Sequence, residues 1–453
     1  MNGYLNESNF MMVEEGFTTR DLLENLLVEL CQVSDQQAFF VADLGDIVKK
    51  HLHFLKALPR VKPYFPVKCN GSEGVIRLLA ELGAGFACTT KAEIARVQSI
   101  GVPADKIFYS SPCKQVAHIK YAASRSVQLM TFDNEVELSK VARSHPRARR
   151  VMLLGIAADS SPSAHPNMTF GTTLKSCRHL LETAKEQAVE VVGISFHLGS
   201  CGLEPQAFAR SVAAAQLAIE VGTELGYRMH LLDIGGGFPG TEDTRAQFKE
   251  IAAVINSALD LYFPDGCGVE IIARPGRYYV TSAFTLAASI TAMEEVPAEQ
   301  PGSDGRWDDG MGPLMSLWHW CILLLLCARS ISPLQRPCPD HPSRSSSLRG
   351  PPAHMEDRIA DGLELPELHV GDWLIFEDMG AYTIATSSSP GGCPQPQITY
   401  AMSRMAWKAV QLFQGKPPQT EDDRESVCAP LSCGWEMAET LCVTPVFAPA
   451  SII

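Results

Sequence analysis

The sequence predicts an α/β protein in which a (β/α)8 barrel is joined to a second, mostly antiparallel β domain. Eight short apolar runs alternate with helical patterns between residues 39 and 238, which is the spacing of a parallel barrel of the TIM type. After one more helical segment, strand-like runs follow one another instead, as they do in an antiparallel sheet. The length of 453 residues, 46% of them apolar, is enough for two such cores.

The predicted barrel strands are all short and apolar. In order they are FFVADL, YFPVKCN, GFACTT, IFYSSP, VQLMTF, VMLLGIA, VEVVGISFHLGS and MHLLDIGGGF. Among the segments between them, residues 91–97 follow the candidate N-caps Thr89 and Thr90, and residues 205–225 carry a long amphipathic pattern. We therefore expect the barrel to occupy residues 39–265.

The remaining residues are expected to form the β domain and its flanks. Three strand-like stretches predict a β domain over residues 266–412; they lie at 269–293, 369–385 and 398–407. Residues 1–38 should pack against this domain rather than open the barrel. Residues 305–350 show neither strand alternation nor fitting turn chemistry, so we expect an irregular insert there, the product of a shifted reading frame or an alternative splice. A specialised hydrophobic insertion is the alternative. Residues 413–453 are predicted to be a mobile tail.

Composition excludes several function classes. The formal charge of −13 argues against general nucleic-acid binding. The fourteen cysteines form no CxxC pairs or His/Cys clusters, which favours reduced thiols in the cytoplasm and no metal site. The apolar run at residues 314–328 is shorter than the roughly 20 residues that a membrane-spanning helix needs, so no span is expected.

Lys68 is the first candidate for chemistry. It ends the apolar run that begins at Pro63, and a lysine at the carboxyl end of a barrel strand is placed to form a Schiff base with a carbonyl cofactor. A surface lysine at a strand end is the alternative. The glycines at 235–237 follow the eighth run and can bring backbone N–H groups to an anion, although tight turns also use such glycines.

Taken with His197-Leu198-Gly199-Ser200 and Pro275-Gly276-Arg277-Tyr278-Tyr279, these elements resemble the ornithine decarboxylase family of pyridoxal-phosphate enzymes. The resemblance implies that His197 lies over the cofactor ring and that Glu93 lies near Lys68. It also implies a set of residues around the cofactor phosphate, namely Ser200, Gly235, Gly236, Gly237, Arg277 and Tyr382.

Four positions depart from that family's pattern. Arg274 stands where active decarboxylases carry the glutamate that keeps the pyridine nitrogen protonated, Ala87 replaces an aspartate, Gly155 an arginine and Ala353 the catalytic cysteine. A carboxylate about 4 Å from a cationic nitrogen contributes about 4 kcal/mol at an effective dielectric near 20, and an arginine replaces that attraction with repulsion. The resemblance therefore implies a pseudoenzyme with a vestigial Lys68 and no bound cofactor. A functional ornithine or amino-acid decarboxylase with pyridoxal phosphate is the alternative, and a non-enzymatic carrier of the cofactor is a third possibility.

A basic segment points to a protein partner. Residues 114–150 contain eight Lys or Arg and three acidic residues, a composition that a merely solvated helix face could also have. Residues 118–141 resemble the antizyme-binding element of ornithine decarboxylase and of the antizyme inhibitors. We expect the apolar strand at 127–132 to form the packed centre of the interface. The charged residues assigned to antizyme binding are Lys120, Arg125, Glu137 and Lys140.

The resemblance to antizyme inhibitors implies a role in regulation. Such a protein sequesters antizyme, frees ornithine decarboxylase from antizyme-driven degradation, and raises polyamine synthesis and uptake. It implies a cytoplasmic location, with the nucleus and perinuclear or Golgi-associated vesicles as further sites. The substrate motifs that the family supplies across its dimer interface have no recognisable equivalents between residues 308 and 334, so a monomer or weak dimer is expected.

Overall fold

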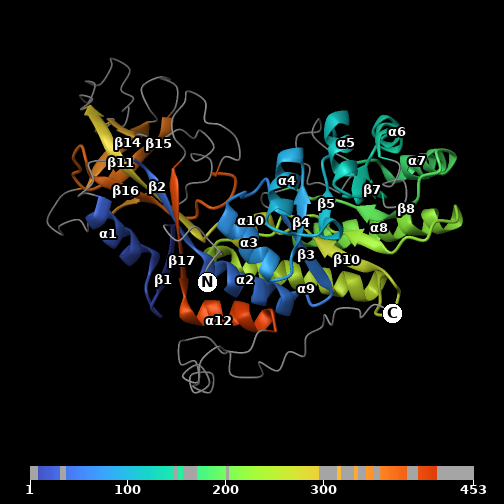
Figure 1. The fold of residues 1–453 in the computed structure, drawn as a ribbon, viewed down its shortest axis with the longest axis horizontal. Coiled ribbons are helices and arrows are strands. Elements are labelled where there is room, and N and C mark those ends of the chain that lie inside the picture. Colours follow the sequence, from blue (N-terminus) through green and yellow to red (C-terminus); the bar gives the residue numbers. More distant parts are fainter. Residues whose placement is uncertain are drawn as a thin grey trace, which may run out of the picture.

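A closed barrel and a separate β-sheet lie side by side in the computed structural model (Figure 1). Most of the barrel helices are on one side of the molecule, and the sheet with α1 (Thr19–Leu30) is on the other. The structure describes residues 9–30, 37–145, 152–156, 171–199, 204–294, 314–317, 331–334, 343–349, 358–384 and 396–415.

Eight parallel strands close the barrel, which confirms the predicted fold class. They are β3 (Val61–Pro66), β4 (Gly85–Cys88), β5 (Ile107–Tyr109), β6 (Met130–Phe132), β7 (Met152–Gly155), β8 (Val191–Ser195), β9 (Leu231–Asp233) and β10 (Glu270–Ala273). Buried side chains from several barrel strands pack together in one cluster, among them Phe108, Val192 and Ile272. The barrel is thus a packed core that leaves only its carboxyl-terminal mouth for a site.

Helices surround the barrel, and one of them carries a cap expected from the sequence. They are α2 (Leu44–Ala57), α3 (Glu73–Glu81), α4 (Lys91–Ser99), α5 (Val116–Ser124), α6 (Glu135–Ser144), α7 (Leu174–Glu186), α8 (Pro205–Glu224) and α9 (Arg245–Tyr262). The Thr90 side chain accepts the Glu93 N–H at the start of α4. The Asn134 side chain accepts the Glu137 N–H at the start of α6. These bonds satisfy first-turn donors and fix where each helix begins.

One member of the predicted set of barrel strands was wrong. The run FFVADL forms β2 (Phe39–Asp43), which pairs with the second sheet through β11 (Phe284–Glu294) and β17 (Gln397–Ser403). The barrel is closed instead by β10, which pairs with β3 and β9. Both segments are short and largely buried, so periodicity could not distinguish them. Their partners, which lie far along the chain, decide the membership.

The second sheet is mixed and mostly antiparallel, as predicted. Its remaining strands are β1 (Phe10–Val13), β12 (Leu314–Leu317), β13 (Ile331–Pro333), β14 (Arg344–Arg349), β15 (Arg358–Leu365) and β16 (Trp373–Phe376). Leucines of α1 pack on Phe39, Val41 and Trp373 of this sheet. The helix α12 (Arg404–Phe413) follows β17 and packs on α2. Strands from both ends of the chain therefore meet in one sheet.

The segment expected to be an irregular insert contains strands. Within residues 305–350, β12 pairs with β11, β13 with β16, and β14 with both β12 and β15. These strands are three to six residues long, which is too short to show an alternating pattern of their own. The rest of the apolar run, residues 318–328, lies outside the described residues, as does the predicted tail from residue 416. In the described parts of the chain, no helix is both long and apolar enough to cross a membrane.

Candidate functional site at the barrel mouth

The mouth of the barrel gathers most of the residues singled out from the sequence. Lys68 follows β3, His197 follows β8, the glycines 235–237 follow β9, and Arg274 follows β10. Because parallel strands end at the same rim, residues far apart in the chain come close there. The charges of Lys68 and Arg274 act on each other and on His197.

The partly buried Arg274 makes an ion pair with a buried carboxylate, which the sequence did not reveal. Its Nε lies 3.0 Å from one carboxylate oxygen of Asp233 and 3.2 Å from the other, and one terminal nitrogen donates to the Phe196 carbonyl at 3.3 Å. Asp233 is fully buried and also accepts from the Ser195 hydroxyl at 2.7 Å. The guanidinium is thus held by a carboxylate of the chain itself, and it lies 5.9 Å from the centre of the Phe108 ring.

The positive charge of Arg274 shifts the pKa values of its neighbours. The pKa of Lys68 is lowered because the surrounding protein removes water from its ammonium and because Arg274 is near, while Glu93 acts in the opposite direction. The pKa of His197 is lowered by desolvation and then by Arg274 and Lys68. His197 Nδ1 accepts the Gly236 N–H at 3.1 Å, which a neutral imidazole can do and an imidazolium cannot.

The glycines after β9 are required by the packing of the chain itself. A Cβ on Gly236 would lie 2.7 Å from the Arg274 carbonyl oxygen, and Gly235 has a φ of +73° with the Phe196 carbonyl 2.4 Å from its ideal Cβ position. The Gly235 N–H donates to Asp233 at 3.0 Å and the Gly236 N–H to His197. Two N–H groups of the expected anion nest are therefore engaged by side chains of the protein.

Arg277 and Tyr382 lie side by side, and Arg277 keeps a donor for an anion. The Arg277 guanidinium lies 4.9 Å from the centre of the Tyr382 ring, and its buried Nε has no hydrogen-bond partner among the described residues. Tyr382 has a φ of +65°, uncommon for a bulky residue, and its N–H donates to the Cys69 carbonyl at 2.7 Å. Burial raises the pKa of the Cys69 thiol to about 12, so this sulfur stays protonated.

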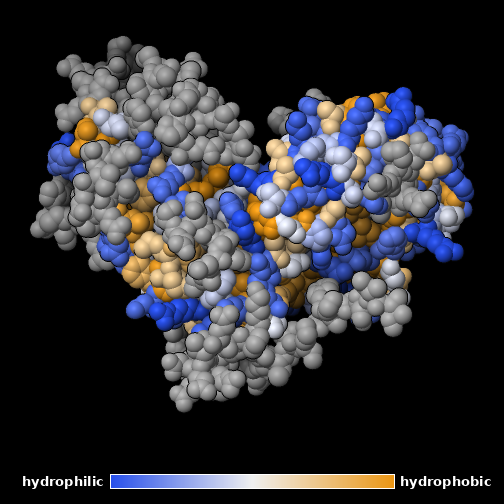
Figure 2. Space-filling view, in the orientation of Figure 1, coloured by the Kyte–Doolittle hydropathy of each residue, from blue (hydrophilic) through white to orange (hydrophobic). Residues whose placement is uncertain are grey.

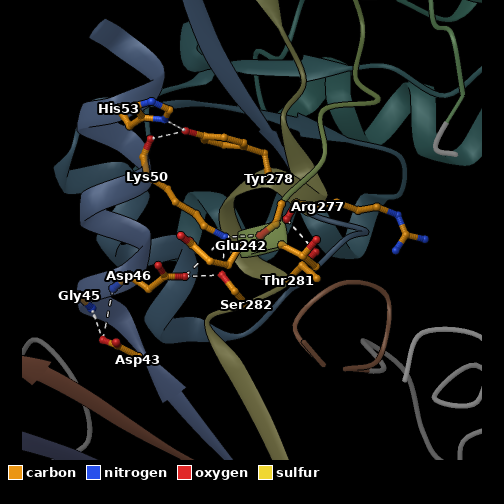
Figure 3. A network of polar contacts seen from close by, with 12 residues as sticks. Asp43, Gly45, Asp46, Lys50, His53, Glu242, Arg277, Tyr278, Thr281 and Ser282 are labelled. Atoms are coloured by element: carbon orange, nitrogen blue, oxygen red, sulfur yellow. Dashed lines mark hydrogen bonds and ion pairs between the residues drawn. The ribbon is translucent and has the colours of Figure 1, made fainter. Parts of the chain in front are cut away.

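A second polar network supports this side of the mouth from α2 (Figure 3). Lys50 Nζ donates to the Gly240 carbonyl at 2.5 Å and to the Ser282 hydroxyl, which in turn donates to Asp46 at 2.6 Å. The Arg277 side chain points away from this network, although its carbonyl accepts the Thr281 hydroxyl. Burial lowers the pKa of Lys50. No motif distinguished this lysine from the other lysines of α2.

Other predicted positions are placed as follows. Ala87 is buried inside the barrel with Phe108, and Gly155 ends β7. Ser200 and Ala353 lie outside the described residues. In the described part of the chain, no group of three His, Cys, Asp or Glu side chains could hold a metal ion.

The predicted partner residues lie on neighbouring helices, but not all are accessible. Lys120 is exposed on α5, and Arg125 follows that helix with its guanidinium 5.4 Å from the centre of the Tyr121 ring. Glu137 on α6 is only 2% exposed, because it pairs with Lys140 at 2.5 Å and with Lys114, whose side chain is 0% exposed, at 2.7 Å. Any role of Glu137 toward a partner must act through Lys140.

The expected packed centre of that surface was wrong. Val127 and the β6 residues Met130 and Phe132 are buried, since β6 is a barrel strand covered on both faces. The exposed apolar side chains of this region are instead Val116 and Val136, in the first turns of α5 and α6. Figure 2 shows apolar atoms among hydrophilic ones on the surface that these two helices form.

Three comparisons relate the chain to known proteins. A family model described as pyridoxal-dependent decarboxylase, pyridoxal binding domain, matches residues 44–281. The chain is 55% identical to antizyme inhibitor 2 of Homo sapiens over the full length of both, and 48% identical to ornithine decarboxylase of Mus musculus over 94% of each. The opening residues 3–17 and closing residues 431–453 also resemble antizyme inhibitor 2. The structure of the Paramecium bursaria Chlorella virus arginine decarboxylase bound to agmatine is 27% identical with a TM-score of 0.75, covering 84% of this chain and 100% of that one.

The residues of the mouth fit one part of pyridoxal phosphate and not another. Arg277, with its unpartnered Nε, and the adjacent Tyr382 suit the phosphate. A protonated pyridine nitrogen needs a carboxylate, but the buried carboxylate of Asp233 is already paired with Arg274, and that of Glu93 accepts the N–H and the hydroxyl of Thr89. The donor set therefore does not fit the whole cofactor.

Proposed function

The chain belongs to the pyridoxal-dependent decarboxylase family, and we propose that within it this ornithine decarboxylase-like protein is catalytically inactive and binds antizyme. The full-length similarity to antizyme inhibitor 2 supports this proposal, because that relative is named for the activity. By holding antizyme, the protein relieves inhibition and degradation of ornithine decarboxylase and so raises polyamine synthesis and uptake. It acts in the cytoplasm, the nucleus and perinuclear or Golgi-associated vesicles, as a monomer or weak dimer.

The ion pair of Arg274 with Asp233 supports the proposal that the protein is catalytically inactive. Because Arg274 is paired with Asp233, the mouth lacks the attraction of about 4 kcal/mol that a free carboxylate would give to a protonated pyridine nitrogen, and this loss lowers the rate by about three powers of ten. The pairing also occupies the Asp233 carboxylate, so Asp233 cannot take the place of the missing glutamate. Pyridoxal phosphate is therefore not expected to be bound.

The exposed basic residues of α5 and its C-terminal end support the proposed binding of antizyme. The chain is acidic overall, so a local positive surface attracts an acidic partner that the rest of the molecule repels. Lys120 and Arg125 are exposed there, and Lys140 keeps some solvent contact beside Glu137.

A decarboxylase activity is the second candidate, and one observation favours it. The lowered pKa of Lys68 is a property that a lysine nucleophile needs, since only the neutral amine attacks a carbonyl. The two candidates differ in the expected absorbance spectrum. A lysine-bound pyridoxal group absorbs near the visible, and we expect no such band from the purified protein after incubation with pyridoxal phosphate.

The experiment measures both activities on one preparation. We expect release of labelled carbon dioxide from ornithine to be no higher than that of a Lys68→Ala variant, while antizyme binds both proteins equally. Release clearly above the Lys68→Ala control would establish the decarboxylase instead. Absence of antizyme binding by the wild-type chain would refute the proposed partner.

Charge reversal then tests the surface. Lys120→Glu should slow association with antizyme and weaken its dependence on salt, because an exposed charge contributes mainly to steering. Adding Lys140→Glu should increase the effect. The single variant is the cleaner test, because Lys140 is bound to Glu137 and its reversal also places two carboxylates together.

A further inference from the structure

Arg277 is a cation without an anionic partner among the described residues. Its guanidinium is partly buried beside the Tyr382 ring, and its Nε is buried with no acceptor there. Figure 3 shows its side chain pointing away from the carboxylates of the Lys50 network. The nearby Cys69 thiol cannot balance the charge, because burial raises its pKa to about 12. A buried charge without a partner is costly, so an anion from outside the chain would stabilise this position.

Two further cations lie beside Arg277 in the barrel mouth. The ideal Cβ position of Gly276 is 3.2 Å from the Cys69 sulfur, so the segments that carry Arg277 and Lys68 are in direct contact. Arg274 precedes Gly276 by two residues, and its charge acts on Lys68. The three cations therefore form one group that two strands, β3 and β10, deliver to the same rim.

Lys68 and Arg274 keep donors for a second acid group. Among the described residues, the Lys68 ammonium has no hydrogen bond or ion pair, and one terminal nitrogen of Arg274 has no hydrogen bond. The two carboxylates near these cations are engaged: Asp233 pairs with Arg274, and Glu93 accepts the N–H and the hydroxyl of Thr89. Three cations against two carboxylates leave one positive charge in this group.

We propose that the barrel mouth binds a phosphorylated carboxylic acid, with the phosphate at Arg277 and the carboxylate at Lys68 and Arg274. A guanidinium with free donors suits a phosphate, and an ammonium beside a second guanidinium suits a carboxylate. Such a ligand has no basic ring, so the charge of Arg274, which disfavours a pyridinium, attracts it instead. Tyr382 belongs to the β domain and its N–H donates to the Cys69 carbonyl of the barrel at 2.7 Å, so the ligand would contact both domains. This site is independent of the proposed binding of antizyme.

The test is a calorimetric titration with glycerol 3-phosphate and with 3-phosphoglycerate, which carries a carboxylate in place of one alcohol. The wild-type chain should bind 3-phosphoglycerate about tenfold more tightly, because one charge-assisted hydrogen bond has roughly that effect on affinity. Lys68→Met should abolish this preference and leave the binding of glycerol 3-phosphate unchanged. Arg277→Met should abolish the binding of both compounds. Without ligand, Arg277→Met should melt at no lower temperature than the wild type, because it removes a charge that has no partner.

Lys62→Met is the matched control, because Lys62 lies on the same strand as the start of the Lys68 segment and its ammonium is 2.9 Å from Glu270. It should bind both compounds as the wild type does, and an equal loss of preference in this variant would refute the site as a mere effect of net charge. Failure of the wild-type chain to bind either compound, equal affinity for the two, or undiminished binding by Arg277→Met would overturn the proposal. So would pyridoxal phosphate bound as tightly as 3-phosphoglycerate, or a lower melting temperature of Arg277→Met without ligand.

Discussion

Replacing Lys114 by methionine should destabilise the protein far more than the loss of an ordinary lysine. The Lys114 ammonium is buried, lies 2.7 Å from the Glu137 carboxylate, and donates to the carbonyls of Thr131 at 2.6 Å and Ser111 at 3.1 Å. Methionine keeps the apolar stem and removes the charge. Glu137 would then retain the partly exposed Lys140 and the backbone N–H of residue 114, which donates to it at 3.1 Å.

The expected cost follows from that geometry. Breaking a buried ion pair costs about 3–5 kcal/mol, because the remaining charge is left without compensation. Since Lys140 still neutralises part of the Glu137 charge, we expect the lower end, about 3 kcal/mol. Urea unfolding at neutral pH would measure this as a fall in the midpoint with an unchanged slope.

Two controls make the experiment decisive. Lys62→Met removes a lysine that lies 2.9 Å from Glu270 with both side chains about 40% exposed, and should cost at most about 1 kcal/mol. The double change Lys114→Met with Glu137→Leu should recover much of the loss, because a hydrophobic pair can replace a buried ion pair at little cost. If Lys114→Met destabilises the protein no more than Lys62→Met does, the reasoning about the buried pair is wrong.

Three further perturbations have expected outcomes. Burial lowers the pKa of His51 to about 4 against about 6.5 when unfolded, so the unfolded state binds more protons between these values. Stability should therefore fall by about 3 kcal/mol as pH drops from 6.5 to 4, and His51→Gln should flatten that slope in urea titrations. Arg274→Met should cost about 3 kcal/mol in the same assay because Asp233 stays buried, and wild-type stability would contradict the pairing. Gly236→Ala should cost about 1–3 kcal/mol and Gly155→Ala less, since the new Cβ meets backbone at 2.7 Å in the first case and 3.4 Å in the second; equal effects would refute the argument.

The sequence predicted the barrel because its strands carry strong local signals. Short apolar runs with helical segments between them are read without knowledge of the partners. The local pattern could not distinguish β2 from β10, because both runs are short and buried. Each strand joins its sheet by pairing with a strand more than 200 residues away in the sequence, β2 with β17 and β10 with β3. The short strands inside residues 305–350 were missed because three to six residues carry too little pattern to predict a strand.

The candidate site was predicted in part, for a comparable reason. Lys68, His197 and the glycines carry motifs, and the barrel brings them to one rim. Asp233 was overlooked because its importance comes from Arg274, 41 residues further on, and Lys114 because its partner is 23 residues away. Burial of Glu137 also could not be read from its charge, which normally indicates a solvated position.

The second sheet cannot be completed until nearly the whole chain has been synthesised. Phe10 of β1 pairs with Tyr400 of β17, so the ribosome must add about 390 residues, which takes roughly 20–80 s, before the first strand meets its partner. The barrel, from Val61 to Ala273, is complete long before that moment. Until β17 is synthesised, the edge of the apolar strand β2 that pairs with β17 has no partner. A nascent chain that stops before β17 should therefore depend on a chaperone to stay monomeric, although its barrel is already folded.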